Sequence, residues 1–154
     1  MSKSFIMRGS QKIKRVKLKI NHDPQSVLFG IVSTEPDYKL SLILNRKLGI
    51  SLRNIGPVIL LHEEHDPELT FSRFSDSSAS TGLIYDLVSN RCGKSCFMKK
   101  IRNIDYLFQV HNADNEPDIN HILSIIREID CVTAVFKIDP VALIKEKNLQ
   151  YITY

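Results

Sequence analysis

Residues 58–89 read VILLHEEHDPELTFSRFSDSSASTGLIYDLVS, and this stretch decides the fold class. Its apolar and alternating runs predict strands at about 58–63, 69–74 and 83–89. His-Asp-Pro-Glu at 65–68 separates the first two runs, and a serine-rich loop at 75–82 separates the last two. Short polar connections of this kind join antiparallel neighbours. Two successive hairpins therefore predict an antiparallel meander.

Upstream of this stretch, the sequence predicts two strands and a helix. VKLKI at 16–20 alternates apolar residues with lysines and is typical of a half-exposed strand, whereas residues 27–33 are apolar on both faces and predict a central strand. Thr34 is a suitable N-cap for a helix with Pro36 in its first turn. Gly49 is expected to end this helix. Its apolar face would consist of Leu40, Ile43, Leu44 and Leu48.

Downstream of the meander, residues 104–110 alternate as a further strand. One face would carry Ile104, Tyr106, Phe108 and Val110, and the other Asp105, Leu107 and Gln109. Asn-Glu-Pro-Asp at 115–118 opens a second helix, whose apolar face would consist of Ile119, Ile122, Leu123 and Ile126. A last strand is expected from the apolar residues Val132, Ala134, Phe136 and Ile138. Asp139 and Pro140 would start a short C-terminal helix.

These elements occur in the order β-β-α-β-β-β-β-α-β-α. Hairpins dominate over βαβ units, so the sequence predicts an α+β fold: an antiparallel-rich mixed sheet of six to seven strands with two or three helices packed on one face. The chain has 154 residues, of which 43% are hydrophobic, and this length suits one core. We expect residues 1–10 to form a flexible arm and residues 11–154 a single globular domain.

The composition also bears on where the protein is located in the cell. No apolar run approaches the roughly 18 residues of a membrane helix, and the N-terminus lacks the pattern of a secretory signal. Cys92, Cys96 and Cys131 are an odd number of cysteines, which does not suggest a disulfide framework. The sequence therefore predicts a cytoplasmic protein that does not associate with membranes.

Positive charge is concentrated in two stretches. Residues 1–20 carry seven basic groups and no acid, so residues 21–154 carry 14 basic and 17 acidic groups. A second acid-free run, residues 91–102, contains five basic groups. If the fold brought 12–19 and 91–102 together, they would form a surface for phosphate-rich partners. Only Phe97 is available within the second run for stacking on bases, so any nucleic-acid binding is expected to be weak and non-specific.

FMKKIRNIDYLFQV, at residues 97–110, resembles the defining stretch of the bacterial IPExxxVDY family of uncharacterised proteins. Ile104-Asp105-Tyr106 occupies the place of the V-D-Y element, and Met98-Lys99-Lys100 that of I-P-E. The KLKI strand, EPDYKL, LNRKLGI and FSRF…YDLVSN agree in order and spacing, so the resemblance covers most of residues 15–110. Lys99 and Lys100 depart from the family's Pro and Glu. The resemblance implies a single domain but no reaction, substrate or partner.

Motifs for metal or nucleotide chemistry are incomplete. His62 and His65 are three residues apart, whereas the zincin motif needs a spacing of four on a helix. Cys92 and Cys96 form one C-x₃-C element, which fits neither paired zinc elements nor a C-x-x-C redox motif. Gly-Lys-Ser at 93–95 lacks the upstream glycine of a P-loop. We therefore expect no metal and no cofactor.

Catalysis is also not indicated by the sequence. A nucleophile elbow such as G-x-S-x-G does not occur, and His121 is expected on the flank of the second helix. No catalytic residues are predicted, although an unrecognised site would still allow an enzyme.

The sequence therefore favours a small non-catalytic interaction or adaptor domain with a protein partner; its oligomeric state is open. Weak nucleic-acid binding through 12–19 and 91–102 is the alternative function, and an enzyme is the third. The candidate interaction residues are Lys99, Lys100, Arg102, Asp105 and Tyr106. We expect Asp105 mainly to accept hydrogen bonds from loop N–H groups or to pair with Lys100 or Arg102, and binding a ligand is its alternative role.

Overall fold

The computed structural model describes residues 26–60, 69–78, 82–111, 118–139 and 143. Six strands form the main sheet in the order β10-β1-β9-β6-β5-β2, and every neighbouring pair is antiparallel. These strands are β1 (Val27–Ser33), β2 (Arg53–Asn54), β5 (Arg73–Asp76), β6 (Ile84–Ser89), β9 (Tyr106–His111) and β10 (Val132–Ile138). The α+β fold with an antiparallel sheet is thus confirmed. The expected strand at 16–20, the arm at 1–10 and most of the C-terminal helix lie outside the described residues.

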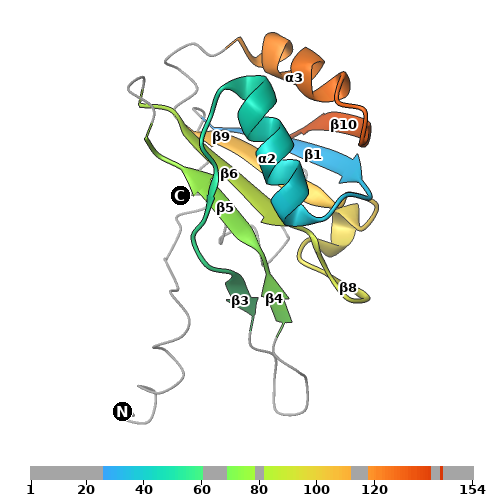
Figure 1. The fold of residues 1–154 in the computed structure, drawn as a ribbon. Coiled ribbons are helices and arrows are strands. Elements are labelled where there is room, and N and C mark those ends of the chain that lie inside the picture. The colour runs from blue at the N-terminus through green and yellow to red at the C-terminus, as the bar shows by residue number, and fades with distance from the viewer. Residues whose placement is uncertain (1–25, 61–68, 79–81, 112–117, 140–142, 144–154) are drawn as a thin grey trace.

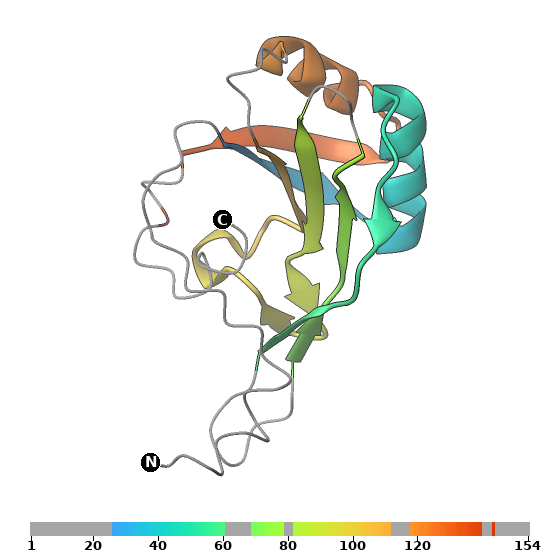
Figure 2. The ribbon, with the colours of Figure 1, turned by 90° about the vertical axis from the view of Figure 1, so that its left-hand side faces the viewer.

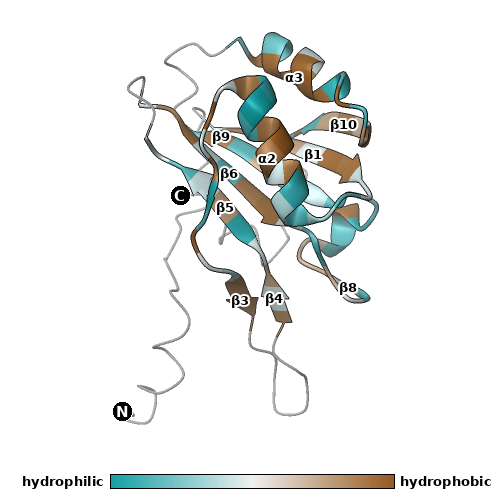
Figure 3. Ribbon diagram, in the orientation of Figure 1, coloured by the Kyte–Doolittle hydropathy of each residue, from teal (hydrophilic) through white to brown (hydrophobic). Residues whose placement is uncertain are grey.

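Two helices cover one face of this sheet (Figure 2). They are α2 (Asp37–Leu48) and α3 (Ile119–Arg127). Leu40 and Leu44 of α2 and Ile122 and Ile126 of α3 are buried against the sheet, as the helical spacing predicts. The brown and teal faces of these helices in Figure 3 show the same segregation of apolar from polar residues.

The opposite face of the sheet carries a second apolar cluster, which the sequence did not predict. Two short hairpins and a 3-10 helix contribute to its cover (Figure 2): β3 (Val58–Leu60) with β4 (Leu69–Phe71), β7 (Arg91–Cys92) with β8 (Ser95–Cys96), and η1 (Lys99–Ile101). Phe71, Phe97 and Met98 are fully buried there. The helices therefore pack on one face, but the core extends over both.

Strand β1 is central because both of its faces are apolar. Phe29 and Ile31 belong to the helix-side cluster, and Leu28 belongs to the opposite cluster. Its neighbours are β10 and β9. Between them Gly30 leaves room for other side chains, because a Cβ there would lie 2.8 Å from Ile138 Cδ1 and 3.0 Å from Ile104 Cδ1. The prediction of a central strand at 27–33 is confirmed.

The meander differs from the prediction at Ser72. The expected strand at 69–74 divides into β4, which pairs with β3, and β5, which pairs with β6 and β2. The β3–β4 hairpin is therefore a separate two-stranded sheet (Figure 1). Strands β2, β7 and β8 were not predicted, because runs of two residues carry no periodicity.

The ends of the helices follow local rules with one exception. Gly49 ends α2 in a left-handed conformation with φ of 67°, and Asp118 caps α3 by accepting from the His121 N–H. The N-cap of α2, however, is Pro36, which makes no side-chain capping hydrogen bond. The prediction of Thr34 as N-cap is wrong, because the chain bends at Glu35, Pro36 is extended, and the helix begins only at Asp37.

Two predicted alternations are also wrong in detail. Ile104 does not share the face of Tyr106, because it precedes β9 and packs in the opposite cluster with Leu107. In β10 the buried residues are Val132 and Val135, whereas Phe136 is 49% exposed. A register irregularity at Ser33, which opposes Val132, shifts the phase of this strand.

Candidate functional site

Asp105 links three segments at one end of the sheet. Its N–H donates to the Ile31 carbonyl at 2.9 Å, and its own carbonyl accepts from the Asn90 N–H at 2.8 Å. Its carboxylate accepts from the Ser33 N–H at 2.9 Å and pairs with Arg91 Nε. The carboxylate was expected to accept from a loop N–H group, but its backbone donor, Ser33, lies at the end of β1.

The structure shows Arg91 in an ion pair with Asp105, in place of the predicted Lys100 or Arg102. The reason is the register of β6 on β9: Ser89 lies opposite Tyr106, so the chain that follows Ser89 passes directly beside Asp105. The hydrogen bond with Asp105 raises the pKa of Arg91. Sequence proximity predicted the wrong partner because the pairing is decided between strands.

Tyr106 anchors the chain that leads into α2. Its ring lies in the helix-side cluster, and its hydroxyl donates to the Glu35 carbonyl. Burial, followed by the nearby carboxylates of Asp37 and Asp105, raises the pKa of Tyr106 to about 12. Asp105 and Tyr106 therefore hold residues 33–35 against the sheet and position the start of α2.

Acidic side chains surround that start of α2. Asp37 accepts from the Tyr38 N–H at 2.7 Å, and Glu35 forms an ion pair with Lys39 at 2.6 Å. The Ser33 hydroxyl accepts from the Glu35 N–H at 3.2 Å. Carboxylates are favourable here because the N-terminus of a helix carries partial positive charge.

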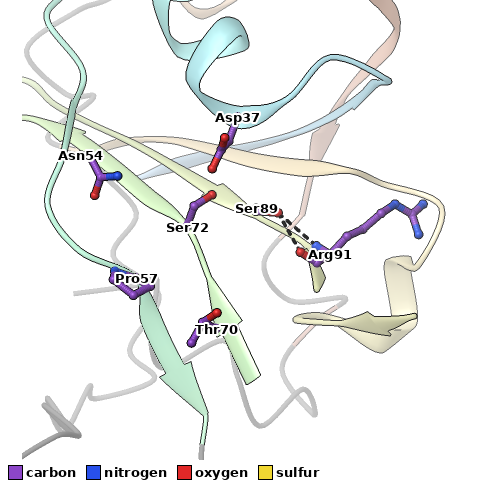
Figure 4. Close-up of a pocket in the computed structure, with 7 residues that line it drawn as sticks. All are labelled: Asp37, Asn54, Pro57, Thr70, Ser72, Ser89 and Arg91. Atoms are coloured by element: carbon purple, nitrogen blue, oxygen red, sulfur yellow. Dashed lines mark hydrogen bonds between the residues drawn. The ribbon is translucent and has the colours of Figure 1, made fainter. Parts of the chain in front are cut away.

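A cleft of about 360 Å³ lies beyond this end of α2 (Figure 4). Its lining residues are Asp37, Asn54, Pro57, Thr70, Ser72, Ser89 and Arg91. Phe74 packs beneath the helix, but two and four residues earlier the same chain carries the short side chains of Ser72 and Thr70. The N-terminal end of α2 lies where these short side chains begin. The surface of the strands that faces the helix is therefore hollowed there.

The interior of the cleft is rich in hydrogen-bond acceptors. Figure 4 shows the Asp37 carboxylate and the Ser72 hydroxyl directed toward one another, whereas the Arg91 guanidinium points away from the other lining residues. Its charge is instead paired with Asp105. The Ser89 hydroxyl is used locally, accepting from the Arg91 N–H and donating to its carbonyl. The charge directed into the cleft is thus negative.

None of the five predicted interaction residues lines the cleft. Lys99, Lys100 and Arg102 are exposed on and after η1. The loop that carries them is organised by Asn90, which is fully buried and was not predicted. Its amide donates to the Ile101 and Ile104 carbonyls at 3.0 and 2.9 Å, and its oxygen accepts from the Met98 N–H at 2.7 Å. No sequence signal marks Asn90, because its partners are 8 to 14 residues away.

A buried polar cluster lies on the sheet face opposite the helices. His111 Nε2 lies 2.8 Å from Asp86 Oδ2, and His111 Nδ1 lies 3.2 Å from Ser26 Oγ. Arg73 lies 3.5 Å from Asp86. Although burial acts in the opposite direction, hydrogen bonds from His111 and Ser75 and the charge of Arg73 lower the pKa of Asp86. Sequence reasoning missed this cluster because its members are up to 85 residues apart.

Metal-ligating residues do not cluster within the described part of the chain. Groups of three or more His, Cys, Asp or Glu side chains suited to a metal are absent there, and Cys92, Cys96 and Cys131 are free thiols. His62 and His65 lie outside the described residues. Among the described helices, none is long and apolar enough to cross a bilayer.

Comparison with known proteins found no matching family model, no matching curated protein and no matching solved structure.

Proposed function

We propose that this chain is a non-catalytic interaction domain, and that its cleft beside α2 binds a positively charged side chain from a partner protein. The observation that carries the proposal is the composition of the cleft: hydroxyl and amide groups around a carboxylate, with the one lining cation turned away. Such a surface accepts hydrogen bonds, and lysine and arginine supply donors with a matching charge.

The position of the cleft favours a defined binding site over a passive surface. Its walls come from segments that are distant in sequence: α2, β2 and the connection after it, β4 and the residue after it, β6 and β7. Asp105 and Tyr106 hold the wall that carries Asp37. Tyr38 and Ile55, which follow two lining residues in the chain, are 61% and 53% exposed. Exposed apolar side chains beside a charged group suit the aliphatic stem of a lysine or arginine.

The test is a titration followed by amide chemical shifts in NMR spectra. The probe is the blocked peptide acetyl-Gly-Lys-Gly-amide, and the comparison is the same peptide with Glu in place of Lys. We expect the lysine peptide to shift the amides of Thr70, Ser72 and Ser89, and the glutamate peptide to leave them unchanged. Asp37→Asn should abolish the response, because it keeps the shape but removes the charge.

The matched control is Asp130→Asn, which removes an exposed carboxylate at a position that does not line the cleft. This variant should respond as the wild type does. Equal shifts with both peptides, or no shifts at the cleft residues, would contradict the proposal.

The exposure of Lys94, Lys99, Lys100 and Arg102 favours a second candidate function, non-specific nucleic-acid binding. Contacts to phosphates release counterions, so affinity for a fluorescent single strand should fall by orders of magnitude between roughly 50 and 200 mM salt. The stretch 12–19 lies outside the described residues, so its position relative to these groups stays a prediction. Binding that survives the higher salt would contradict the non-specific mode.

Catalysis by Ser26 is the third candidate, favoured by the Ser26–His111–Asp86 hydrogen bonds. A serine beside a histidine that is oriented by a carboxylate is the arrangement used in nucleophilic catalysis. Labelling with a fluorophosphonate, followed by peptide mass spectrometry, tests it. Modification of Ser26 that disappears in His111→Gln would support hydrolase activity, and an unmodified Ser26 would exclude this candidate.

We also propose that the chain is a divergent member of the IPExxxVDY family. The roles of Asp105 and Tyr106 support this, because both residues of the D-Y pair hold α2 in place. Lys99 and Lys100, which replace the family's Pro and Glu, are exposed on η1. A change of residue type is tolerated more readily at such positions than in the core.

A further inference from the structure

The outward face of α2 carries exposed apolar residues as well as charge. Tyr38 and Leu42 are four residues apart and therefore neighbours on the helix surface, and they are 61% and 57% exposed. Arg46, a further four residues along the helix, is also exposed. These three residues form a stripe, termed the α2 stripe, which begins next to Asp37 of the cleft and runs toward the C-terminal end of the helix.

The charge along α2 changes sign from one end to the other. The Asp37 carboxylate lies at the N-terminal end, and the last turn carries Arg46 and Lys47. Lys39, between these ends, is paired with Glu35. Among the residues that the structure describes, no carboxylate forms an ion pair with Arg46. A partner is therefore complementary to this face when it places a cation at one end and an acid at the other.

We propose that the partner segment continues from the cleft along the α2 stripe in an extended conformation, with an apolar side chain on Tyr38 and Leu42 and a carboxylate on Arg46. The cation in the cleft is that of the proposed function, on which this inference rests. The occupant is thus a peptide segment that combines a cation, an apolar residue and an acid.

The geometry of the helix sets the spacing of these three groups. Asp37 and Arg46 are about 13 Å apart along the helix axis, because a helix rises about 1.5 Å per residue. An extended segment advances about 3.3 Å per residue, so its acid lies about four residues from its cation. Side chains at every second position of such a segment point the same way, so the apolar residue lies midway. The pattern is cation-x-apolar-x-acid, in either chain direction.

The charges favour a peptide over an anionic membrane as the occupant. Helices with apolar and basic side chains on one face also bind lipid surfaces. The α2 stripe, however, offers two apolar residues, and the carboxylates of Glu35 and Asp37 lie at its N-terminal end. Anionic headgroups would be repelled there, whereas a segment with charges of both signs is attracted at both ends.

The test is a titration of the full chain with two peptides, followed by amide chemical shifts. The probes are acetyl-Gly-Lys-Thr-Leu-Thr-Glu-Gly-amide and the reversed acetyl-Gly-Glu-Thr-Leu-Thr-Lys-Gly-amide, each compared with its form carrying Gln in place of Glu. At least one probe should shift the amides of Tyr38, Leu42 and Arg46 together with those of the cleft. It should bind about two- to five-fold more tightly than its Gln form, which is the contribution of an exposed ion pair.

Substitutions on the helix assign this preference to its residues. Arg46→Gln should remove the preference for Glu over Gln. Lys47→Gln is the matched control, because it removes the same charge at a position rotated by about 100° around the helix, and the preference should persist. Leu42→Ala should weaken binding of the probe several-fold through loss of the apolar contact. Phe136→Ala, which truncates an exposed apolar residue of β10, should leave it unchanged.

The outcomes distinguish a failure of this inference from a failure of the proposed function. If the probes shift the cleft amides but the preference for Glu is absent or survives Arg46→Gln, the cleft binds a cation and the α2 stripe does not bind the partner. If a probe shifts the stripe amides alone, or no amides at all, both proposals are wrong. Adsorption to phosphatidylserine vesicles that is lost in Leu42→Ala, without binding of either probe, would assign the α2 stripe to a lipid surface and overturn the proposal.

Discussion

At the scale of single residues, Asp105 connects strands and loop through its backbone and its side chain. Replacing it with Ala leaves the Ser33 N–H and the Arg91 guanidinium without their acceptor. We expect Asp105→Ala to lower the free energy of unfolding by about 1–3 kcal/mol, and Asp105→Asn to lower it less because one oxygen remains. Urea denaturation followed by circular dichroism measures both.

Asp130→Ala, which removes an exposed acid, is the control for this experiment and should change stability little. If Asp105→Ala kept wild-type stability but lost the peptide response of the cleft, Asp105 would contact the ligand itself and would not act as a positioning residue.

Asp86 provides a pH prediction at the same scale. Its side chain is 4% exposed, and its pKa in the folded protein lies below the ordinary value of 3.8. The unfolded chain therefore binds this proton more readily than the folded chain, so its contribution to stability is complete above about pH 5 and is lost as pH falls through the folded pKa. Unfolding free energies measured from about pH 6 to 3 should decrease toward acid.

Asp86→Asn should make this pH dependence shallower, although the variant is less stable at neutral pH because Arg73 and His111 lose a charged partner. Asp130→Asn serves as the control and should keep the wild-type slope. Identical slopes in the wild type and Asp86→Asn would show that Asp86 does not drive the acid sensitivity.

At the scale of elements, close packing of β1 depends on Gly30. A Cβ at this position would approach Ile138 Cδ1 to 2.8 Å and Ile104 Cδ1 to 3.0 Å. We expect Gly30→Ala to destabilise the protein by about 1–3 kcal/mol, because the neighbouring side chains must leave their preferred positions. Thermal and urea unfolding measure the loss.

Ile138→Val removes the nearest atom, so Gly30→Ala combined with Ile138→Val should be more stable than the sum of the two single effects predicts. Strict additivity would show that the strain arises elsewhere. The control is the double variant Gly30→Ala with Val58→Ala. Val58 belongs to the same apolar cluster but is not among the atoms nearest Gly30, so the two effects should add.

At the scale of the whole molecule, we predict that the two apolar clusters suffice for folding without a metal. We expect the melting temperature to be the same with and without a chelator in reducing buffer, with all three cysteines titrating as free thiols. Elemental analysis gives an independent measurement. A stoichiometric metal, or a large fall in melting temperature with chelator, would contradict this prediction.

Elements whose signals are local followed from the amino-acid sequence alone. The central strand at 27–33, the end of the first helix at Gly49 and the start of the second within 115–118 depend on residues a few positions apart. Side-chain periodicity and capping act over that distance, so they can be read along the chain. The α+β class follows from the same signals, because short polar connections between strands favour antiparallel neighbours.

The tertiary structure decided which distant groups meet. The Arg91–Asp105 pair, the Ser26–His111–Asp86 cluster and the cleft between α2 and β4 depend on strand registers. The burial of Val132 in the same cluster as Val135 depends on an irregularity in the pairing of β1 with β10. A shift of one residue in a register moves every side chain of a strand to the other face, and many small packing terms choose between such alternatives. Those terms act across the sheet and leave no pattern along the chain.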